Sequence, residues 1–446
     1  MFKTMQNAWK IPDLRKKILF TLMVIIVFRI GANMPAPFLN MDALAGLMGF
    51  VTSGDNASNA NAFAYLNTLS GGAFSQATLF AMSVTPYINS SIIMQLLTVA
   101  IPPLERMAKE GEDGRKKIGA ITRYVAVLLG LVQGLAYYLY LRGSSFEGTP
   151  IVSYTEGAAG IFTAIVIVLV FTAGTAMMMW LGEQINQKGI GNGISILLFA
   201  GIVARLPDTV NILVQALQAA WQAPDSFGKY FFFVPLFVII FLAVIWIIVF
   251  MNDAERRIPV QYAKRVVGRK MYGGQSTHLP IKVNMSGVMP IIFASSILTI
   301  PSTIQMFVNP TGFWKTILDA LSTTGWVYAL IYFLLILMFA YFYVAIQYNP
   351  IEMANNLRQN NGTIPGIRPG RPTSDYIQRI LSKITLIGAL FLAVIALLPV
   401  AFSAFTGMHN LMMGGTSVII LVGVALDTMK QMESQMMMRH YKGFLD

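Results

Sequence analysis

Side chains that could bind or transfer protons are scarce in the long apolar stretches of this sequence. Arg29 is the one charge well inside such a stretch, whereas Glu183 and Asp427 lie near the ends of others. Coupled transporters usually hold an acidic, histidine or lysine side chain near mid-membrane, where it carries the proton or cation. All three histidines lie outside the apolar stretches. These residues favour a passive conduit over an ion-driven transporter.

Motifs for catalysis are missing as well. A membrane metalloprotease needs His-Glu-x-x-His on a helix and a nucleotide hydrolase needs a P-loop, and the sequence contains neither motif. Because there is no cysteine, disulfides and thiolate metal sites are excluded. We therefore expect no enzyme activity, no metal and no cofactor. Two rival classes stay open: a small-solute transporter with a polar midplane site, and an intramembrane enzyme.

The apolar stretches set the fold class. Only 12% of the residues are charged, against about 25% in a soluble domain. Residues 18–34 and 231–251 each reach roughly the 20 residues that a helix needs to cross a membrane, and they lack the alternation of a barrel strand. We predict an all-α integral membrane protein of about ten transmembrane helices. The predicted spans are 17–37, 77–100, 119–141, 158–182, 190–206, 230–252, 286–307, 326–348, 381–402 and 411–430.

Lysine and arginine orient these spans. They concentrate before the first span, in the loops 101–123, 183–189, 253–285 and 349–383, and in the C-terminal tail, whereas few lie on the other side. The positive-inside rule then makes both termini cytoplasmic. The basic N-terminal end could also begin a signal peptide, but Arg29 interrupts the apolar stretch and no clean cleavage site follows. We expect the first span to be retained.

The two halves of the chain share a pattern. Ten spans divide into five and five, so the second half enters the membrane from the opposite side, as in inverted repeats. Pro86-Tyr87-Ile88 in the second span matches Pro290-Ile291-Ile292 in the seventh, and both are followed by Ser-Ser-Ile. The predicted halves are 1–207 and 208–446. Chance similarity stays open, because each match is weak alone.

Several stretches spread along the chain resemble the SecY family of bacterial protein-export channels. They are Leu69-Ser70-Gly71-Gly72-Ala73, Gly111-Glu112-Asp113-Gly114-Arg115-Lys116, Trp180-Leu181-Gly182-Glu183-Gln184-Ile185, Gly189-Ile190-Gly191-Asn192-Gly193-Ile194-Ser195, Tyr262-Ala263-Lys264-Arg265, Gln275-Ser276-Thr277-His278-Leu279-Pro280, Pro365-Gly366-Ile367-Arg368-Pro369-Gly370 and Gly414-Gly415-Thr416-Ser417. The resemblance implies two five-helix halves around an hourglass pore in the bacterial cytoplasmic membrane. Unfolded secretory polypeptides would cross this pore, and transmembrane segments would leave it sideways into lipid.

The resemblance also implies partners. The pore would be passive and driven by the SecA motor ATPase or by the ribosome. SecE and SecG would be its companion subunits. Signal peptides and nascent polypeptides would be its cargo, and membrane lipids would surround it.

The resemblance places the pore constriction at six aliphatic residues: Val84, Ile88, Ile194, Leu198, Ile292 and Ile420. Two pairs among them are four residues apart, so each pair shares one helix face. An aliphatic ring dewets when empty and so blocks ions. The alternative is that apolar residues at helical spacing only pack against their neighbours.

A plug is expected on the extracellular side of the ring, at about residues 62–77. This apolar segment is too short to span the membrane, and the resemblance assigns to the plug Phe63, Tyr65, Leu66, Leu69, Gly71 and Gly72. An interfacial helix resting on the membrane is the alternative. The lateral gate would lie between the second/third and seventh/eighth spans. Asn89, Ser90 and Gln133 could hydrogen-bond across it, or could make ordinary contacts between helices.

The two largest cytoplasmic loops would receive SecA or the ribosome. The candidate docking residues are Arg256, Arg257, Lys264, Arg265, Arg269, Lys270, Arg368, Arg371 and Tyr441. Positive-inside topology alone would also enrich these loops in basic residues. However, the prolines and glycines on both sides of Arg368 fix the backbone there, which favours presentation of that side chain.

Overall fold

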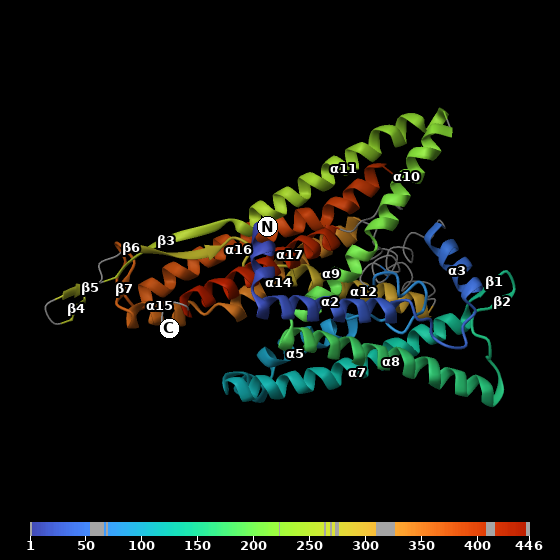
Figure 1. Ribbon diagram of the computed structural model, residues 1–446, viewed down its shortest axis with the longest axis horizontal. Coiled ribbons are helices and arrows are strands. Elements are labelled where there is room, and N and C mark those ends of the chain that lie inside the picture. Colours follow the sequence, from blue (N-terminus) through green and yellow to red (C-terminus); the bar gives the residue numbers. More distant parts are fainter. Residues whose placement is uncertain are drawn as a thin grey trace.

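The structure is a computed structural model that describes residues 2–53, 67, 70–222, 224–262, 265–267, 270–272, 276–308, 326–406 and 415–442 (Figure 1). Its helices are α1 (Phe2–Lys10), α2 (Pro12–Ala32), α3 (Met41–Ser53), α5 (Thr85–Ala100), α6 (Pro102–Lys109), α7 (Glu112–Gly143), α8 (Gly157–Lys188), α9 (Gly193–Ala204), α10 (Leu206–Gln222), α11 (Pro224–Asp253), α12 (Met289–Val308), α14 (Trp326–Gln347), α15 (Pro350–Gln359), α16 (Arg371–Thr406) and α17 (Gly415–Lys442). Its strands are β1 (Ser145–Phe146), β2 (Thr149–Pro150), β3 (Glu255–Tyr262), β4 (Arg265–Val267), β5 (Lys270–Tyr272), β6 (Ser276–Lys282) and β7 (Gly362–Thr363).

Every predicted span contains a helix. The matching helices are α2, α5, α7, α8, α9, α11, α12, α14, α16 and α17. By length and apolar composition, six helices among the described residues could cross a membrane, or seven if α5 and α6 form one span bent by 101°. Exposed Ile161, Trp246 and Val394 lie on three of these helices, as expected for surfaces that face lipid. The prediction of a helical, multi-pass membrane protein is confirmed.

One predicted span begins in the wrong place. The second span was expected at residue 77, but helix α5 begins only at Thr85, with Pro86 in its first turn. Proline suits the first helical positions because its missing N–H would have no partner there. Residues 70–84 form turns instead, and Ala77 and Ser83 adopt positive φ angles of 42° and 52°. Their apolar composition reflects burial in these turns rather than a helical conformation.

The two large basic loops contain strands that the all-α prediction did not include. Strands β6, β3 and β7 form a three-stranded antiparallel sheet in that order, so the two large loops 253–285 and 349–383 meet in one sheet. Ile258 and Val260 alternate with exposed neighbours along β3 and are buried. They join an apolar cluster with Ile377 of α16, which anchors the sheet on the helices.

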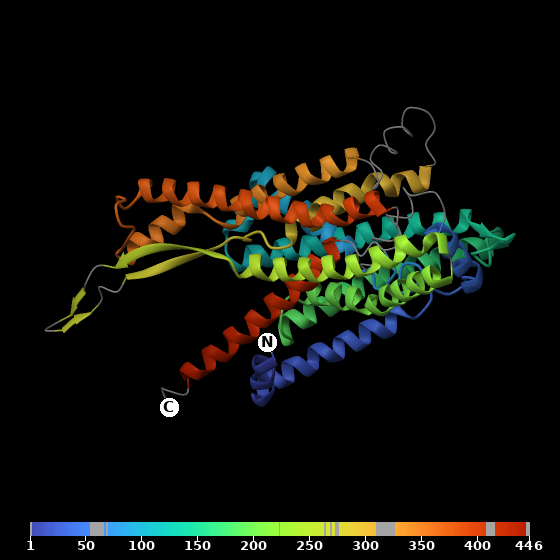
Figure 2. The ribbon, with the colours of Figure 1, turned by 90° about the horizontal axis from the view of Figure 1, so that it is seen from above.

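The molecule has two distinct ends. The sheet projects from one end of the helical bundle, and both chain termini lie toward this end (Figures 1 and 2). Helix α3 and the β1–β2 hairpin lie at the opposite end (Figure 1). The largest apolar cluster lies within the bundle and includes residues of α2, α5, α9, α12 and α17. A second cluster packs α3 and residues 74–82 against α7 and α8.

Candidate functional site

The six residues predicted to form the pore ring lie in or against the largest apolar cluster of the bundle. Five are buried, and Ile194, which is half-buried, packs against the same cluster. They come from the starts of four different helices: Val84 and Ile88 at α5, Ile194 and Leu198 in α9, Ile292 in α12, and Ile420 in α17. Helix α9 packs against α17, and α5 contacts α12. The arrangement is an aliphatic centre built by helix N-termini.

The ring residues occupy matching places in their helices. Ile88 is the fourth residue of α5, and Ile292 is the fourth residue of α12. Leu198 is the sixth residue of α9, and Ile420 is the sixth residue of α17. The sequence correspondence between the two halves is therefore matched by the positions of these residues along their helices.

Local sequence fixes the start of α9. The side chain of Asn192 accepts hydrogen bonds from the N–H groups of Ile194 and Ser195, at 3.2 and 3.4 Å, and so caps the helix. Gly193 lies so close to α8 that an added Cβ would meet the carbonyl oxygen of Gly182. Its N–H also donates to the side chain of Asn186, at 2.7 Å. These contacts place Ile194 and Leu198 at the centre of the bundle.

Of the predicted plug, residue 67 and residues 70–77 lie among the described residues. Phe63, Tyr65, Leu66 and Leu69 lie outside the described residues. Gly71 and Gly72 adopt positive φ angles of 67° and 94°, which glycine tolerates best. Gly71 rests against the backbone of Gly201 in α9, and its carbonyl accepts a hydrogen bond from Arg29 at 3.3 Å. Arg29 therefore binds the turn at the C-terminal end of the predicted plug, ahead of α5.

The partner of Arg29 was not foreseen from the sequence. A single arginine within an apolar span signals a buried polar partner. The partner is a backbone carbonyl 42 residues away, however, and neither composition nor a motif indicates it.

The helices of the predicted lateral gate are in contact. Helix α5 packs along α7, and α12 touches both. Ser90 is buried, but its hydroxyl donates to the carbonyl of Tyr87 at 2.8 Å, within its own helix. This bond lies within α5, and the role of Ser90 in the gate stays a prediction. Asn89 and Gln133 are half-buried, and their gate role stays a prediction.

One charged contact near the gate was not predicted. Arg123 of α7 and Glu183 of α8 form an ion pair at 2.6 Å. The arginine side chain is half exposed and that of Glu183 is about a quarter exposed, so the pair lies at the border of the bundle. It joins α7 to α8 rather than to α5 or α12.

Two of the predicted docking residues lie on the three-stranded sheet, and a third lies in the turn that follows β7. Arg256 and Arg257 are exposed on β3, and Arg257 pairs with Glu255 at 2.7 Å. Arg368 is exposed in a turn between Gly366 and Gly370, whose φ angles are 82° and 104°.

The remaining docking residues are partly described. Arg371 is exposed and begins α16. Arg265 and Lys270 lie in the paired strands β4 and β5, and Tyr441 lies in the last turn of α17. Lys264 and Arg269 lie outside the described residues.

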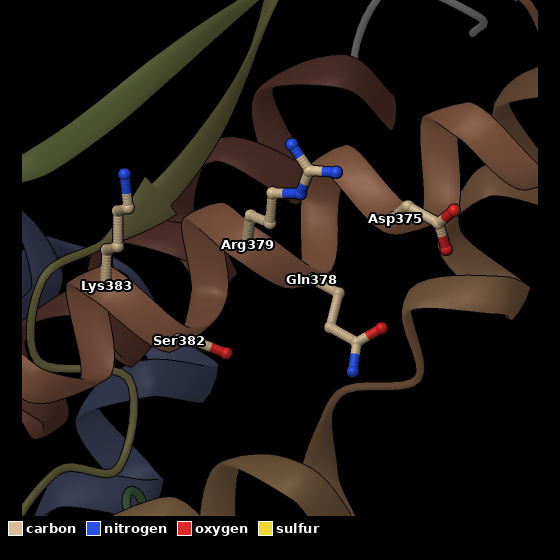
Figure 3. A pocket seen from close by; sticks show the side chains of 5 residues that line it. All are labelled: Asp375, Gln378, Arg379, Ser382 and Lys383. Carbon is tan, nitrogen blue, oxygen red and sulfur yellow. The ribbon is translucent and has the colours of Figure 1, made fainter.

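Basic side chains continue from the sheet onto α16. Arg379 and Lys383 border an open pocket of about 460 Å³ together with Asp375, Gln378 and Ser382 (Figure 3). In the close-up, the nitrogen ends of Arg379 and Lys383 point to the same side of the helix, and the carboxylate of Asp375 points away from them. The end of the bundle that bears the sheet thus carries several exposed basic side chains.

Comparison with known proteins gives a consistent result. A family model for SecY matches residues 78–429. The chain is 44% identical over 450 residues to a protein translocase subunit SecY of Streptomyces coelicolor, and 44% identical over 447 residues to that of Bacillus subtilis; each match covers all of both chains.

Solved structures share the fold at lower identity. One, described as "The structure of a protein conducting channel", has a TM-score of 0.61 at 18% identity and covers 94% of this chain and 92% of its own. A canine Sec61 in a ribosome-channel complex has a TM-score of 0.58 at 17% identity, with the same shares covered. The full-length identity and the family match together show that this chain belongs to the SecY family.

Proposed function

We propose that this chain is the pore subunit of a protein translocase. It conducts unfolded secretory polypeptides across the membrane and releases transmembrane segments sideways into lipid. The observation that carries the proposal is the aliphatic centre, in which four helix N-termini bring Val84, Ile88, Ile194, Leu198, Ile292 and Ile420 into one cluster. Membership of a family whose curated relatives are translocase subunits supports it.

The chemistry of the ring suits this task. Aliphatic side chains offer no hydrogen bonds, so a polypeptide of any sequence can pass without being held. When no polypeptide is present, an apolar constriction excludes water and therefore ions. A transporter for a small solute would need polar groups at this position, and the ring has none of its own.

The two halves, 1–207 and 208–446, form inverted five-helix repeats in this proposal, with ten spans and an hourglass pore between them. The matching places of Ile88 and Ile292, and of Leu198 and Ile420, support this symmetry. The basic loops and both termini face the cytoplasm of a bacterial cell, and the protein resides in its cytoplasmic membrane. The common position of the sheet and the termini at one end of the bundle supports that orientation (Figures 1 and 2).

The plug and the gate complete the channel. Residues from about 62 to 77 close the extracellular side of the ring, and Arg29 holds the base of this plug through Gly71. The gate opens between α5 and α7 on one side and α12 and α14 on the other, so that an apolar segment can enter the lipid. Asn89 and Gln133 lie on the gate helices.

The cationic end receives the driving partner. Arg256, Arg257 and Arg368 present charge from a sheet that is anchored on the helices. SecA and the ribosome dock here, and ribosomal RNA phosphates suit these side chains. Two solved relatives are ribosome-bound channel complexes, a canine Sec61 and a yeast Ssh1. SecE and SecG are the companion subunits in this proposal.

Site-specific crosslinking tests the proposal. A photoreactive residue is placed at Ile292 or Ile88, and ribosomes supply a stalled secretory nascent chain. We expect a crosslink between the nascent chain and either position. A matched probe at Arg368 should reach the ribosome or SecA instead. Crosslinks at Arg368 without any at the ring would show that the pore lies elsewhere. The absence of crosslinks at all three positions would refute the translocase function.

A further inference from the structure

A long-range hydrogen bond joins the base of the plug to a gate helix. The hydroxyl of Tyr137, on α7, donates to the backbone carbonyl of Phe74 at 2.7 Å. The two rings stack with centroids 4.6 Å apart and planes inclined by 27°. Tyr137 is only 2% exposed and Phe74 only 4%. The contact therefore lies inside the apolar cluster at the end of the bundle where α3 packs.

Several hydrogen bonds hold the turn that contains Phe74 together. The hydroxyl of Ser70 accepts a hydrogen bond from the N–H of Phe74 at 3.0 Å, and the side chain of Asn67 accepts one from the N–H of Ser75 at 3.1 Å. Arg29 binds the same turn through Gly71. A displacement of the Phe74 carbonyl would therefore also displace this turn and the part of the plug that precedes it.

The donor of this hydrogen bond, Tyr137, lies on α7, and α7 must move when the lateral gate opens. Helix α7 packs against α5 and touches α12. If α7 moves away from α12, the Tyr137 hydroxyl must either carry Phe74 with it or lose its acceptor. A buried tyrosine hydroxyl that has lost its partner is costly, so the two movements are linked.

We infer that Tyr137 is a positioning residue that couples the lateral gate to the plug. In the closed channel its hydroxyl holds the plug base, and displacement of α7 releases it. This inference rests on the proposed function, because it presumes that residues 62–77 act as a plug and that α7 lines the gate. It adds a named link between these two parts.

The sharpest test removes only the hydroxyl. Tyr137→Phe retains the stacked ring, and Tyr138→Phe is the matched control, because Tyr138 is the next residue of the same helix and is also 2% exposed. The purified translocase complex is reconstituted in liposomes, and its ion leak is measured without substrate. We expect about a fivefold higher leak for Tyr137→Phe, the effect of one ordinary hydrogen bond on a closed–open equilibrium, and no change for Tyr138→Phe. Loss of one hydrogen bond should lower the thermal unfolding midpoint of Tyr137→Phe by no more than about 4 °C, so the variant stays folded, and the midpoint of Tyr138→Phe should match that of the parent.

A plug deletion separates this inference from the proposed function. Deleting residues 62–69 should make the parent channel leak, and adding Tyr137→Phe to the deletion should raise the leak no further. If the deletion leaks while Tyr137→Phe alone leaks no more than Tyr138→Phe, the coupling is refuted and the plug stands. If Tyr137→Phe still adds leak in the deleted background, it acts through helix packing and the coupling is also refuted. If the channel that lacks residues 62–69 does not leak, the plug of the proposed function is refuted.

Discussion

The turn at Gly71 and Gly72 allows the closed state to be tested with neighbouring substitutions. Both residues have positive φ angles, which cost an alanine about 1–2 kcal/mol. At Gly71 an added Cβ would also lie 2.9 Å from the Cα of Gly201 and 3.1 Å from the Arg29 guanidinium. At Gly72 the nearest atom would be 3.8 Å away, an ordinary contact. Only Gly71→Ala must therefore push the turn away from α9 and weaken the Arg29 bond.

The expected loss of closed-state stability follows from the backbone strain and the contacts of Gly71. Loss of the Arg29–Gly71 hydrogen bond removes about 1 kcal/mol beyond the backbone strain that both variants share. We therefore expect Gly71→Ala to destabilise the closed plug by about 2–3 kcal/mol. Its resting ion leak in liposomes should exceed that of Gly72→Ala about fivefold. The φ of 94° at Gly72 is further from the usual left-handed region than the 67° at Gly71, so strain alone would favour the opposite order.

The leak of the two variants decides between the explanations. A Gly72→Ala leak equal to or greater than that of Gly71→Ala would show that backbone strain, rather than the contact with Gly201 and Arg29, controls the turn. A tight Gly71→Ala channel would mean that this turn does not hold the plug, and the reasoning from the contact would be wrong. Both variants should be compared at matched levels of folded complex, which the thermal unfolding midpoint reports.

Three further predictions concern the surrounding helices. Asn192→Ala removes the cap of α9 and should lower the free energy of unfolding by about 1 kcal/mol, seen as a lower unfolding midpoint and a leakier ring. A double-mutant cycle with Arg123→Ala and Glu183→Gln should give a coupling energy of about 1 kcal/mol or less, because this pair is partly exposed; a larger value would mark it as a major link between α7 and α8. The hydrogen bond from Lys109 lowers the pKa of Glu105 below its ordinary 4.5, so the contribution of this pair is present above that pKa and is lost as pH falls through the lowered value. Lys109→Ala should return the pKa of Glu105 to its ordinary range in an NMR titration, and an unchanged pKa would contradict this cause.

The spans could be predicted because burial in a membrane leaves a long apolar signal. The same signal misplaced the start of α5, since residues 70–84 are apolar and yet form turns. Their composition reflects packing against α7 and α8, and hydropathy cannot distinguish an apolar turn inside a protein from a helix in lipid. Positive φ at Ala77 and Ser83 is set by this packing. Neither alanine nor serine is typical of a positive φ angle, so the sequence does not indicate this conformation.

The strands of the two large basic loops carried a weak sequence signal of their own. Ile258 and Val260 alternate with polar residues along β3, which is the period of a half-buried strand. The prediction for this loop rested on its basic charge and not on its alternation. Pairing with β7 brings together residues about a hundred positions apart, such as Gln261 and Thr363, so the sheet could not follow from either loop alone.

The ring and the plug depend on sequence in different ways. Each ring residue sits within two turns of a helix start, and local features set some of these starts: Pro86 for α5, and Asn192 with Gly193 for α9. The resemblance placed the ring, which stays a prediction, and local sequence accounts for the starts of two of the helices that carry it. The turn predicted to form the plug base is held by bonds from Arg29 and Tyr137, which lie 42 and 63 residues away from their acceptors. A substitution near the ring should thus alter one helix start, whereas a change at either distant residue should alter plug closure while leaving every helix start intact.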